Sequence, residues 1–409
     1  MKQMDETFCK SFRYEEYKTH VARLQRYMKE SQCDALLLST PENVYYATGY
    51  RTWYTASLFR PVFCVVPKEG DPAIILRILE KTTVQLYAWL PNENIYCWGT
   101  PTRNLGPLQA TSVIDALHKI FERVAPNTKT VGLEAGTGLN YYNSLTLLKE
   151  IIDEFSDKEF VDGSYAIQHA RMVKTPWEIS KIRECTKLTE RAIDQTCRAI
   201  VPGKTTEKDV ARGIAQIMAA GGVDRISYLT VVSGDVKMKT FNAYATDRVI
   251  EKGDVVQLDI SGHIDGYASD LSRVYVMGEA TQEQKEMAQV AFDSVRVAVE
   301  AMKPGVPAST INRICEDYIA NSKFGDFVIH SSGHCLGLNV VEFPTLCDET
   351  HTPLEEGMVF AVENGVYPFD LSIGAESIYA SFRYEDQILV TKDGAEWLSG
   401  PAEPLVEVK

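Results

Sequence analysis

Two aspartates in the second half of the chain have the spacing of neighbours in a β-hairpin. Asp259 and Asp270 are eleven residues apart, and Gly262 and Gly266-Tyr267 between them indicate a tight turn. Two antiparallel strands would then hold these carboxylates side by side. Such carboxylates repel each other unless one is protonated or a cation lies between them. The pair therefore predicts a shared proton or a bound metal.

Three further side chains downstream could bind metal. His330-Ser-Ser-Gly-His334 places two histidines four residues apart beside a glycine, Glu363 lies in the apolar run VFAVENGVYP, and Glu385 precedes the strand-like QILV. A buried charge in an apolar strand must be paired or must ligate a metal. Four acids and one histidine form an oxygen-rich set. Such a set fits two cations that share carboxylates better than it fits one zinc ion held by nitrogen and sulfur.

A weak internal duplication predicts how these residues come together. The first copy has a long helix, a Pro-Gly turn, a second helix and a strand, at 176–200, 201–203, from 206 and at 227–233. The second copy repeats this order, with a helix from Thr281 that Gln284 helps to cap, a Pro-Gly turn at 303–305, a helix to about Ala320 and a strand near 327–331. Two such copies usually pack about a pseudo-two-fold axis.

Each copy ends in a matching phrase, EKGDVVQLDI at 251–260 and EEGMVFAVEN at 355–364. In both phrases a glycine is followed six residues later by an acid, Asp259 in the first and Glu363 in the second. These acids should occupy equivalent points on paired strands. The pseudo-symmetry would make them face each other across the centre of the domain.

The elements that must position these residues divide into two domains. A chain of 409 residues is too long for one ordinary core. Strand-like and helical segments alternate over the first 160 residues, which is typical of an α/β domain. Thr175-Pro176-Trp177-Glu178 then predicts the start of a long helix with a capping box. We therefore predict domains at 1–165 and 166–409.

Composition limits the partners and the location. The formal net charge is -14 with a pI near 5.1, and no basic patch is present, which argues against nucleic acid as a partner. No run of 18 apolar residues predicts a membrane span, and the first residues lack the apolar region of a signal peptide. The nine cysteines show no zinc-binding spacing and are expected to be reduced thiols. These features predict a cytoplasmic protein.

Residues 170–400 resemble the catalytic domain of the pita-bread metallopeptidase family, which includes methionine aminopeptidase, aminopeptidase P, prolidase and creatinase. The resemblance lies in LDISG, GYASDLSRVY, HSSGHCLGL, FAVENGVYP and RYEDQILV, which contain Asp259, Asp270, His334, Glu363 and Glu385. The first 160 residues resemble the amino-terminal domain of creatinase and prolidase, notably in DALLLSTPENVYYATGY. The implied fold is an α/β amino-terminal domain followed by a duplicated αβ catalytic domain.

The resemblance implies roles for these residues around two divalent cations, which could be manganese, zinc, cobalt or iron. Asp259 would chelate one cation, His334 and Glu363 mainly the other, and Asp270 and Glu385 would bridge them. The cations would lie roughly 3.5–4 Å apart and hold a bridging hydroxide as nucleophile. His330, Glu363 and Glu385 would act in catalysis. Arg383 would pair with a ligand carboxylate and fix its orientation.

Two positions depart from the peptidase pattern. The peptidases have a histidine where this chain has Val341 in Val341-Glu342-Phe343-Pro344, and Asn242 stands where they have another. Those histidines contact the scissile group, a contribution worth roughly 2–4 kcal/mol in the transition state. Losing both while keeping five metal ligands favours a metal-dependent hydrolase of a small amide or amidine-like compound.

Three alternatives stay open. The chain could be an Xaa-Pro aminopeptidase or dipeptidase, so that the substrate is a short peptide instead of another small molecule. It could be a metal-dependent lyase of a small zwitterion such as dimethylsulfoniopropionate, although Ser261 stands where those lyases have an additional metal-binding aspartate. It could also be a non-catalytic binding protein with the same fold.

The aromatic stretch of the first domain is a candidate lid over the substrate. In two-domain relatives, the amino-terminal domain of one subunit lies at the edge of its neighbour's active site, so the resemblance predicts a homodimer. Aromatic rings could hold a cationic substrate group, and an arginine could hold a carboxylate. The candidate lid residues are Arg51, Trp53, Tyr54 and Arg60. The alternative interpretation is an aromatic cluster at a domain interface.

Overall fold

The computed structural model describes residues 14–409 except 53, 55–58, 101–107, 235–242 and 369–380. The chain divides into two compact units, Met1–Arg171 and Met172–Lys409. Among the helices of the described residues, none has both the length and the apolar character needed to cross a bilayer.

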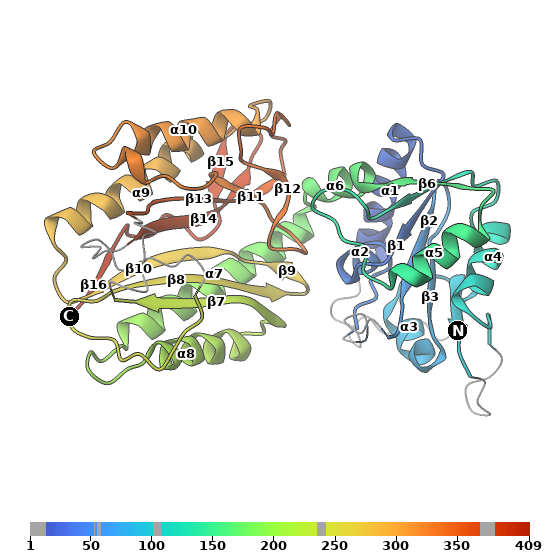
Figure 1. The fold of residues 1–409 in the computed structure, drawn as a ribbon, viewed down its shortest axis with the longest axis horizontal. Coiled ribbons are helices and arrows are strands. Elements are labelled where there is room, and N and C mark those ends of the chain that lie inside the picture. The colour runs from blue at the N-terminus through green and yellow to red at the C-terminus, as the bar shows by residue number, and fades with distance from the viewer. Residues whose placement is uncertain (1–13, 53, 55–58, 101–107, 235–242, 369–380) are drawn as a thin grey trace. The chain divides into compact units, whose positions relative to one another are not determined.

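The first unit is built on a mixed six-stranded sheet (Figure 1). Its strands, in spatial order, are β4 (Ile95–Trp98), β3 (Ala73–Arg77), β2 (Phe63–Pro67), β1 (Ala35–Leu38), β5 (Thr130–Leu133) and β6 (Glu159–Asp162). Its helices are α1 (Tyr14–Glu30), α2 (Pro41–Thr48), α3 (Lys81–Tyr87), α4 (Val113–Arg123), α5 (Leu145–Glu154) and α6 (Ser164–Met172). The central strand β1 is apolar and buried at every position, as expected of a strand that is covered on both faces.

The second unit is built on a ten-stranded sheet. Its main path runs β12 (Glu342–Thr345), β11 (Gly333–Cys335), β13 (Val359–Val366), β14 (Phe382–Val390), β10 (Leu271–Met277), β8 (Val255–Ile264) and β7 (Arg225–Ser233). Three short strands pair beside this path: β9 (Tyr267–Ala268) with β8, β15 (Ala395–Trp397) with β14, and β16 (Val406–Val408) with β10.

Two pairs of helices cover this sheet (Figure 1). Helices α7 (Pro176–Arg198) and α8 (Glu207–Ala220) bury their apolar faces against β7, β8 and β10. Helices α9 (Gln282–Ala301) and α10 (Ala308–Ala320) do the same against β13 and β14. The predicted capping boxes are confirmed: Thr175 with Glu178 opens α7, and Thr281 with Gln284 opens α9.

The internal duplication is visible in the backbone. Gly203 N donates to Ile250 O at 2.8 Å in the first copy, and Gly305 N donates to Leu354 O at 2.9 Å in the second. The glycines before the two acids, Gly253 and Gly357, have nearly equal φ angles of 93° and 91°, which side chains with a Cβ rarely adopt. The two halves therefore repeat the same turn immediately before β8 and β13.

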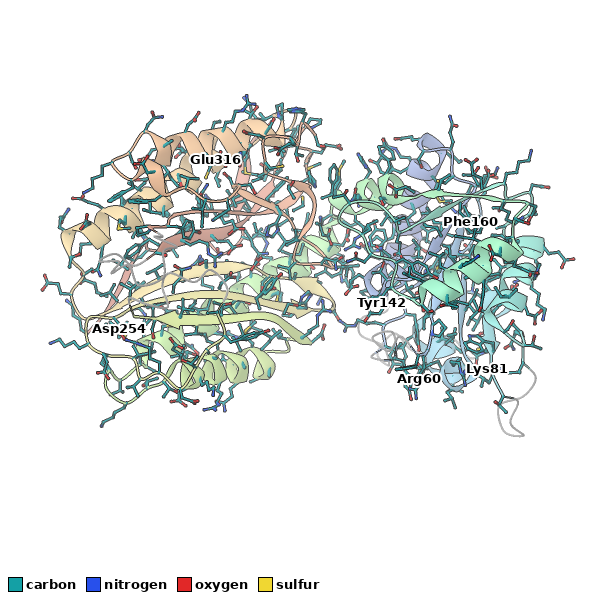
Figure 2. The ribbon with its side chains drawn as sticks, viewed as in Figure 1. Arg60, Lys81, Tyr142, Phe160, Asp254 and Glu316 are labelled. Carbon is teal, nitrogen blue, oxygen red and sulfur yellow. The ribbon has the colours of Figure 1, made fainter. Side chains whose placement is uncertain are left out.

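The first of these turns is held by an ion pair. Asp254, labelled in Figure 2, follows Gly253 and accepts a hydrogen bond from Arg248 Nη2 at 3.0 Å. Asp254 Oδ2 also accepts the backbone N–H of Glu251 at 2.7 Å. The carboxylate thus fixes both the turn and the segment that enters it.

One predicted strand is wrong. The segment 327–331 forms no strand; a 3-10 turn spans Gly325–Phe327, and β11 begins only at Gly333. Before β11, the backbone N–H of Ser332 donates to Asn312 Oδ1 at 2.9 Å as well as to Leu346 O at 3.1 Å. The side chain of Asn312 on α10 thus accepts a backbone hydrogen bond at a position where, in a regular strand, only a neighbouring strand would accept it.

Candidate metal centre

Three of the four candidate carboxylates stand in one row across the sheet. Asp259 on β8 is in register with Ser272 on β10, Ser272 with Glu385 on β14, and Glu385 with Glu363 on β13. Residues in register on neighbouring strands project from the same face of a sheet. The row therefore directs the acids of both copies toward one place.

Asp270 and His334 complete the group. His334 Nε2 lies 3.8 Å from Asp270 Oδ2 and 3.8 Å from Glu363 Oε1. Ligand atoms of Asp270, His334 and Glu385 all lie within 4.8 Å of one another. The structure thus brings together all five residues that the sequence singled out as metal ligands, from the strands and turns of both copies. Their role as ligands stays a prediction.

The hairpin that carries the two aspartates turns at Asp265-Gly266. Both residues have positive φ, 50° and 85°, and the flanking pairs are His263–Ala268 and Ile264–Tyr267. These are the features of a type I′ turn. The expected hairpin is confirmed. Gly262, however, lies inside β8, where an added Cβ would come 2.4 Å from Met218 Cε on α8, so it serves close packing instead of the turn.

Gly333 allows β11 to approach β13 closely enough to present His334. Its φ is 127°, and an added Cβ would lie 2.0 Å from Ala361 O on β13. Only glycine is compatible with this approach. Steric constraints therefore require a glycine beside His334.

The ring orientation of His334 suits a metal ligand. Its Nδ1 lies 3.0 Å from the carbonyl oxygen of Cys335, which can only accept a hydrogen bond. The proton therefore resides on Nδ1, and the Nε2 lone pair points toward the carboxylates. The 3.8 Å separations are too long for hydrogen bonds and leave space for a cation between these side chains.

Burial of so many acids is unfavourable without compensation. Burial raises the pKa of Asp259, Asp270 and Glu385 above their ordinary values, and neighbouring carboxylates raise each pKa further. Asp270 Oδ1 is buried and, among the described residues, has no hydrogen-bond partner. A carboxylate oxygen in this state fits a cation ligand. The donor set as a whole fits a pair of hard or borderline divalent cations.

Two arginines cross the join between the copies, one on each face of the sheet. Arg383 of β14 donates to Asp259 Oδ2 at 2.6 Å and to Ser272 Oγ at 3.3 Å, and its Nη1 lies 3.6 Å from Glu363 Oε2. Arg273 of β10 donates to the Glu385 carbonyl at 2.6 Å and to Asp386 Oδ2 at 2.9 Å. The contact of Arg383 with a candidate ligand carboxylate is the one that the sequence predicted.

His330 is half-buried beside Tyr367. Its Nδ1 is 2.6 Å from the carbonyl oxygen of Ser331, and its Nε2 is 2.7 Å from the Tyr367 hydroxyl. Burial lowers the pKa of His330, so the ring is neutral at pH 7. The carbonyl places the proton on Nδ1, and Nε2 accepts from Tyr367.

Tyr228 is a residue of this site that the sequence did not indicate. Strand β7 has an irregularity between Ile226 and Tyr228, and both Ile226 and Leu229 pack into the core beneath α7 and α8. The bulge therefore leaves Tyr228 on the face of the carboxylates. Burial and then the four carboxylates raise the pKa of Tyr228. Because a bulge breaks the two-residue alternation, the sequence carried no signal for this placement.

Of the two positions that depart from the peptidase pattern, the structure describes Val341. Val341 is 52% exposed and directly precedes β12, whose Thr345 pairs with His334. The next residue, Glu342, forms a buried ion pair with Lys174 at 3.2 Å. Asn242 lies outside the described residues.

The candidate lid residues belong to the first unit. The Arg60 guanidinium, labelled in Figure 2, lies 4.3 Å from the centre of the Tyr54 ring, and that of Arg51 lies 5.6 Å from the Tyr45 ring. Trp53 lies outside the described residues. These cation–π contacts lie within the unit, and a role in covering substrate stays a prediction.

The raised carboxyl pKa values predict how the metal-free protein responds to pH. A carboxyl group whose pKa is higher in the folded than in the unfolded state stabilises the fold at low pH, and this stabilisation is lost as pH rises through the folded value. We expect the gain in melting temperature on adding Mn²⁺ to grow between about pH 5 and about pH 8, since cations must displace these protons. Calorimetry with and without chelator measures this gain. An equal gain at both pH values would contradict the prediction.

Comparison with known proteins agrees with this geometry. A family model described as metallopeptidase family M24 matches residues 180–392, and one described as the creatinase/prolidase N-terminal domain matches residues 20–173. The chain is 28% identical over 382 residues to an Xaa-Pro dipeptidase of Pyrococcus furiosus, which covers 93% of this chain and 98% of that protein. It is 27% identical over 388 residues to a protein of Staphylococcus aureus that is named an uncharacterized peptidase, covering 93% of this chain and 99% of that protein.

Solved structures show the same architecture. The prolidase from Pyrococcus horikoshii matches with a TM-score of 0.77 and 25% identity over 94% of this chain and 99% of its own. The X-Pro aminopeptidase from Thermotoga maritima matches with a TM-score of 0.77 and 25% identity over 95% of this chain and 99% of its own. The predicted fold and the resemblance to this family are confirmed. Since the M24 model alone spans more than half of the sequence, the chain belongs to metallopeptidase family M24 and is a hydrolase.

Proposed function

We propose that this protein is a metal-dependent peptidase that cleaves Xaa-Pro dipeptides. The convergence of Asp259, Asp270, His334, Glu363 and Glu385 on one place carries the proposal. Relatives named Xaa-Pro dipeptidase extend over nearly the whole chain, and they favour this alternative over the non-peptide substrate that the sequence suggested. Membership in a hydrolase family also argues against the non-catalytic alternative.

The chain's own residues would hold two cations in an asymmetric way. Asp259 would bind one cation, His334 and Glu363 the other, and Asp270 and Glu385 would lie between them. When bound, the cations supply the Lewis acidity that activates water and polarises a substrate carbonyl. Four carboxylates balance the charge of two divalent cations, which explains how these acids share one buried place.

The surrounding residues would orient the ligand side chains and fix the positions of protons. Arg383 fixes one oxygen of Asp259 and leaves the other for a cation. His330 keeps its proton on Nδ1 and is neutral, so it does not repel a cation or a substrate amine. Tyr367 holds the ring of His330 in place through its hydroxyl. These contacts favour a pre-organised site.

The test uses the full-length protein loaded with Mn²⁺. Ala-Pro, Gly-Pro and Xaa-Pro-Xaa peptides are offered, and proline or the free amino-terminal residue is quantified. Release of proline from the dipeptides at ordinary enzyme rates supports the proposal, and preference for the longer peptides would indicate an aminopeptidase instead. A fully metal-loaded protein that leaves all of these peptides intact would refute it.

Val341 favours a second candidate, a hydrolase of small non-peptide amides. The position that carries a histidine in the peptidases is here an exposed apolar side chain beside β12. An apolar group cannot donate a hydrogen bond to the scissile group. A screen of small amides and amidines with the same Mn²⁺-loaded protein distinguishes the two candidates by relative kcat/KM.

Replacing Val341 by histidine should raise activity on Xaa-Pro peptides. We expect kcat/KM for Ala-Pro to increase about tenfold or more in Val341→His, because a hydrogen-bonding group of this kind typically contributes a factor of that size or larger. Val341→Gln is the control, since it adds polarity and bulk without an imidazole. If both variants match the wild type, the missing histidine is not what limits peptide turnover.

A further inference from the structure

A buried hydroxyl beside the carboxylates has no hydrogen-bond partner. Ser261 follows Asp259 by two residues in β8 and therefore lies on the same face of the sheet. Its side chain is 0% exposed, and among the described residues its Oγ has no hydrogen-bond partner. A hydroxyl buried without a partner is unfavourable. A bound ligand on this face of the sheet would satisfy this oxygen.

A second unpartnered oxygen lies directly across from it. Ile260 pairs with Leu271, and both pack into the core beneath α7 and α8. One step further along this antiparallel register, Ser261 of β8 stands opposite Asp270, whose Oδ1 is buried and also without a partner among the described residues. Cross-strand neighbours have Cβ atoms roughly 4.5–5.5 Å apart. Two unsatisfied oxygens thus lie within reach of one small ligand.

Two other polar side chains of this hairpin are satisfied, whereas Gln257 Oε1, two residues before Asp259 on β8, is also buried and has no hydrogen-bond partner among the described residues. Ser269 Oγ accepts from Gly262 N at 3.1 Å and is 2.8 Å from Thr189 Oγ1. Ser272 Oγ donates to Leu258 O at 2.8 Å. The unsatisfied oxygens of Ser261 and Asp270 are the two that stand opposite each other beside the carboxylate cluster.

We propose that Ser261 Oγ is an additional oxygen ligand of the cation held by Asp259 and Asp270. The inference rests on the proposed metal centre. A neutral hydroxyl adds a ligand without changing the charge balance between four carboxylates and two divalent cations. All protein ligands of this cation would then be oxygen atoms, whereas the ligands of the other cation include the imidazole of His334. Oxygen-only sites favour hard cations such as Mn²⁺, and imidazole suits zinc or cobalt. Ser261 would thus make the two positions prefer different metals.

The first experiment titrates Mn²⁺ into the metal-stripped full-length protein by calorimetry. Wild type should bind two Mn²⁺, and Ser261→Ala should bind one of them about tenfold more weakly with the other unchanged. Ser294→Ala is the matched control, because Ser294 is equally buried but bonded to Ala291 O on α9. Wild type that binds fewer than two Mn²⁺ would overturn the metal centre itself. Two Mn²⁺ with equal affinities in wild type and Ser261→Ala would overturn only the role of Ser261.

Two further measurements separate a ligand from a structural hydroxyl. The melting temperature of metal-free Ser261→Ala should equal or exceed that of wild type, since an unsatisfied hydroxyl is removed; a decrease marks a structural role and overturns the proposal. Ser261→Cys replaces the hard oxygen by a soft sulfur of similar size. It should raise the affinity for Cd²⁺ relative to Mn²⁺ and add a thiolate-to-Cd²⁺ charge-transfer absorbance. The absence of that absorbance in a protein that binds Cd²⁺ contradicts direct ligation.

Discussion

Replacing Asp270 by alanine is expected to remove both cations. Asp270 lies between the candidate ligands of the two copies: its Oδ2 is 3.8 Å from His334 Nε2, and its Oδ1 has no protein partner among the described residues. A ligand shared by both cations leaves each of them under-coordinated when it is lost. We expect the metal content to fall from about two per chain to near zero, and kcat/KM to fall about a thousandfold or more, because the cations supply several kcal/mol of transition-state stabilisation. Elemental analysis after dialysis against Mn²⁺ measures the first effect.

The control for this variant is Asp265→Asn in the turn of the same hairpin. Asp265 has a positive φ that asparagine tolerates, and its ion pair with Lys181 at 3.0 Å is partly exposed to solvent, which screens the interaction. Asp265→Asn should retain both metals and full activity. Should Asp270→Ala keep two metals per chain, the bridging assignment is wrong.

Replacing Arg383 by methionine is expected to destabilise the metal-free protein strongly. Arg383 is 3% exposed and pairs with Asp259 at 2.6 Å and Glu363 at 3.6 Å. Removing one partner of a buried ion pair typically costs about 3–5 kcal/mol, because the remaining charge is uncompensated. Proton uptake by Asp259, whose pKa burial already raises, lessens this loss at low pH. Urea unfolding in the presence of a chelator at neutral pH measures the change.

Arg183→Met is the matched control for that experiment. Arg183 makes two hydrogen bonds to Glu396, at 2.7 and 3.1 Å, but both side chains are substantially exposed. A surface pair of this kind contributes about 0–1 kcal/mol. If Arg383→Met unfolds at the same urea concentration as Arg183→Met, the charge of Arg383 is not needed to hold the carboxylates.

Local signals account for the part of the structure that the sequence predicted well. The capping residues Thr175 and Thr281 mark the starts of α7 and α9, and the glycine–acid spacing marks β8 and β13. Each of these signals depends on residues within one turn or one strand. The turn at Gly266 was also predictable, because a two-residue hairpin requires positive φ at defined positions.

Signals that depend on distant segments were not available. The bulge beside Tyr228 and the late start of β11 at Gly333 follow from pairing with strands far away in sequence. The side chain of Asn312 on α10 accepts a hydrogen bond from the backbone N–H of Ser332. The residues next to Asn312 in the chain give no indication of this role. The substrate preference was equally inaccessible, since Val341 alone cannot show which group replaces the missing imidazole.

The middle of the large sheet has a mechanical consequence. Within the described residues, β10 and β14 share one register pair, Ser272 with Glu385, whereas β13 and β14 pair along their whole length. An apolar cluster joins Val274 and Val276 of β10 to Val366 and Phe382 of the second copy. The polar part of the join is formed by Arg273 and Arg383, and any cations that the acids hold would add to it. High ionic strength and chelation should therefore weaken the polar part of this join, so that the groups proposed for chemistry also help to hold the two copies together.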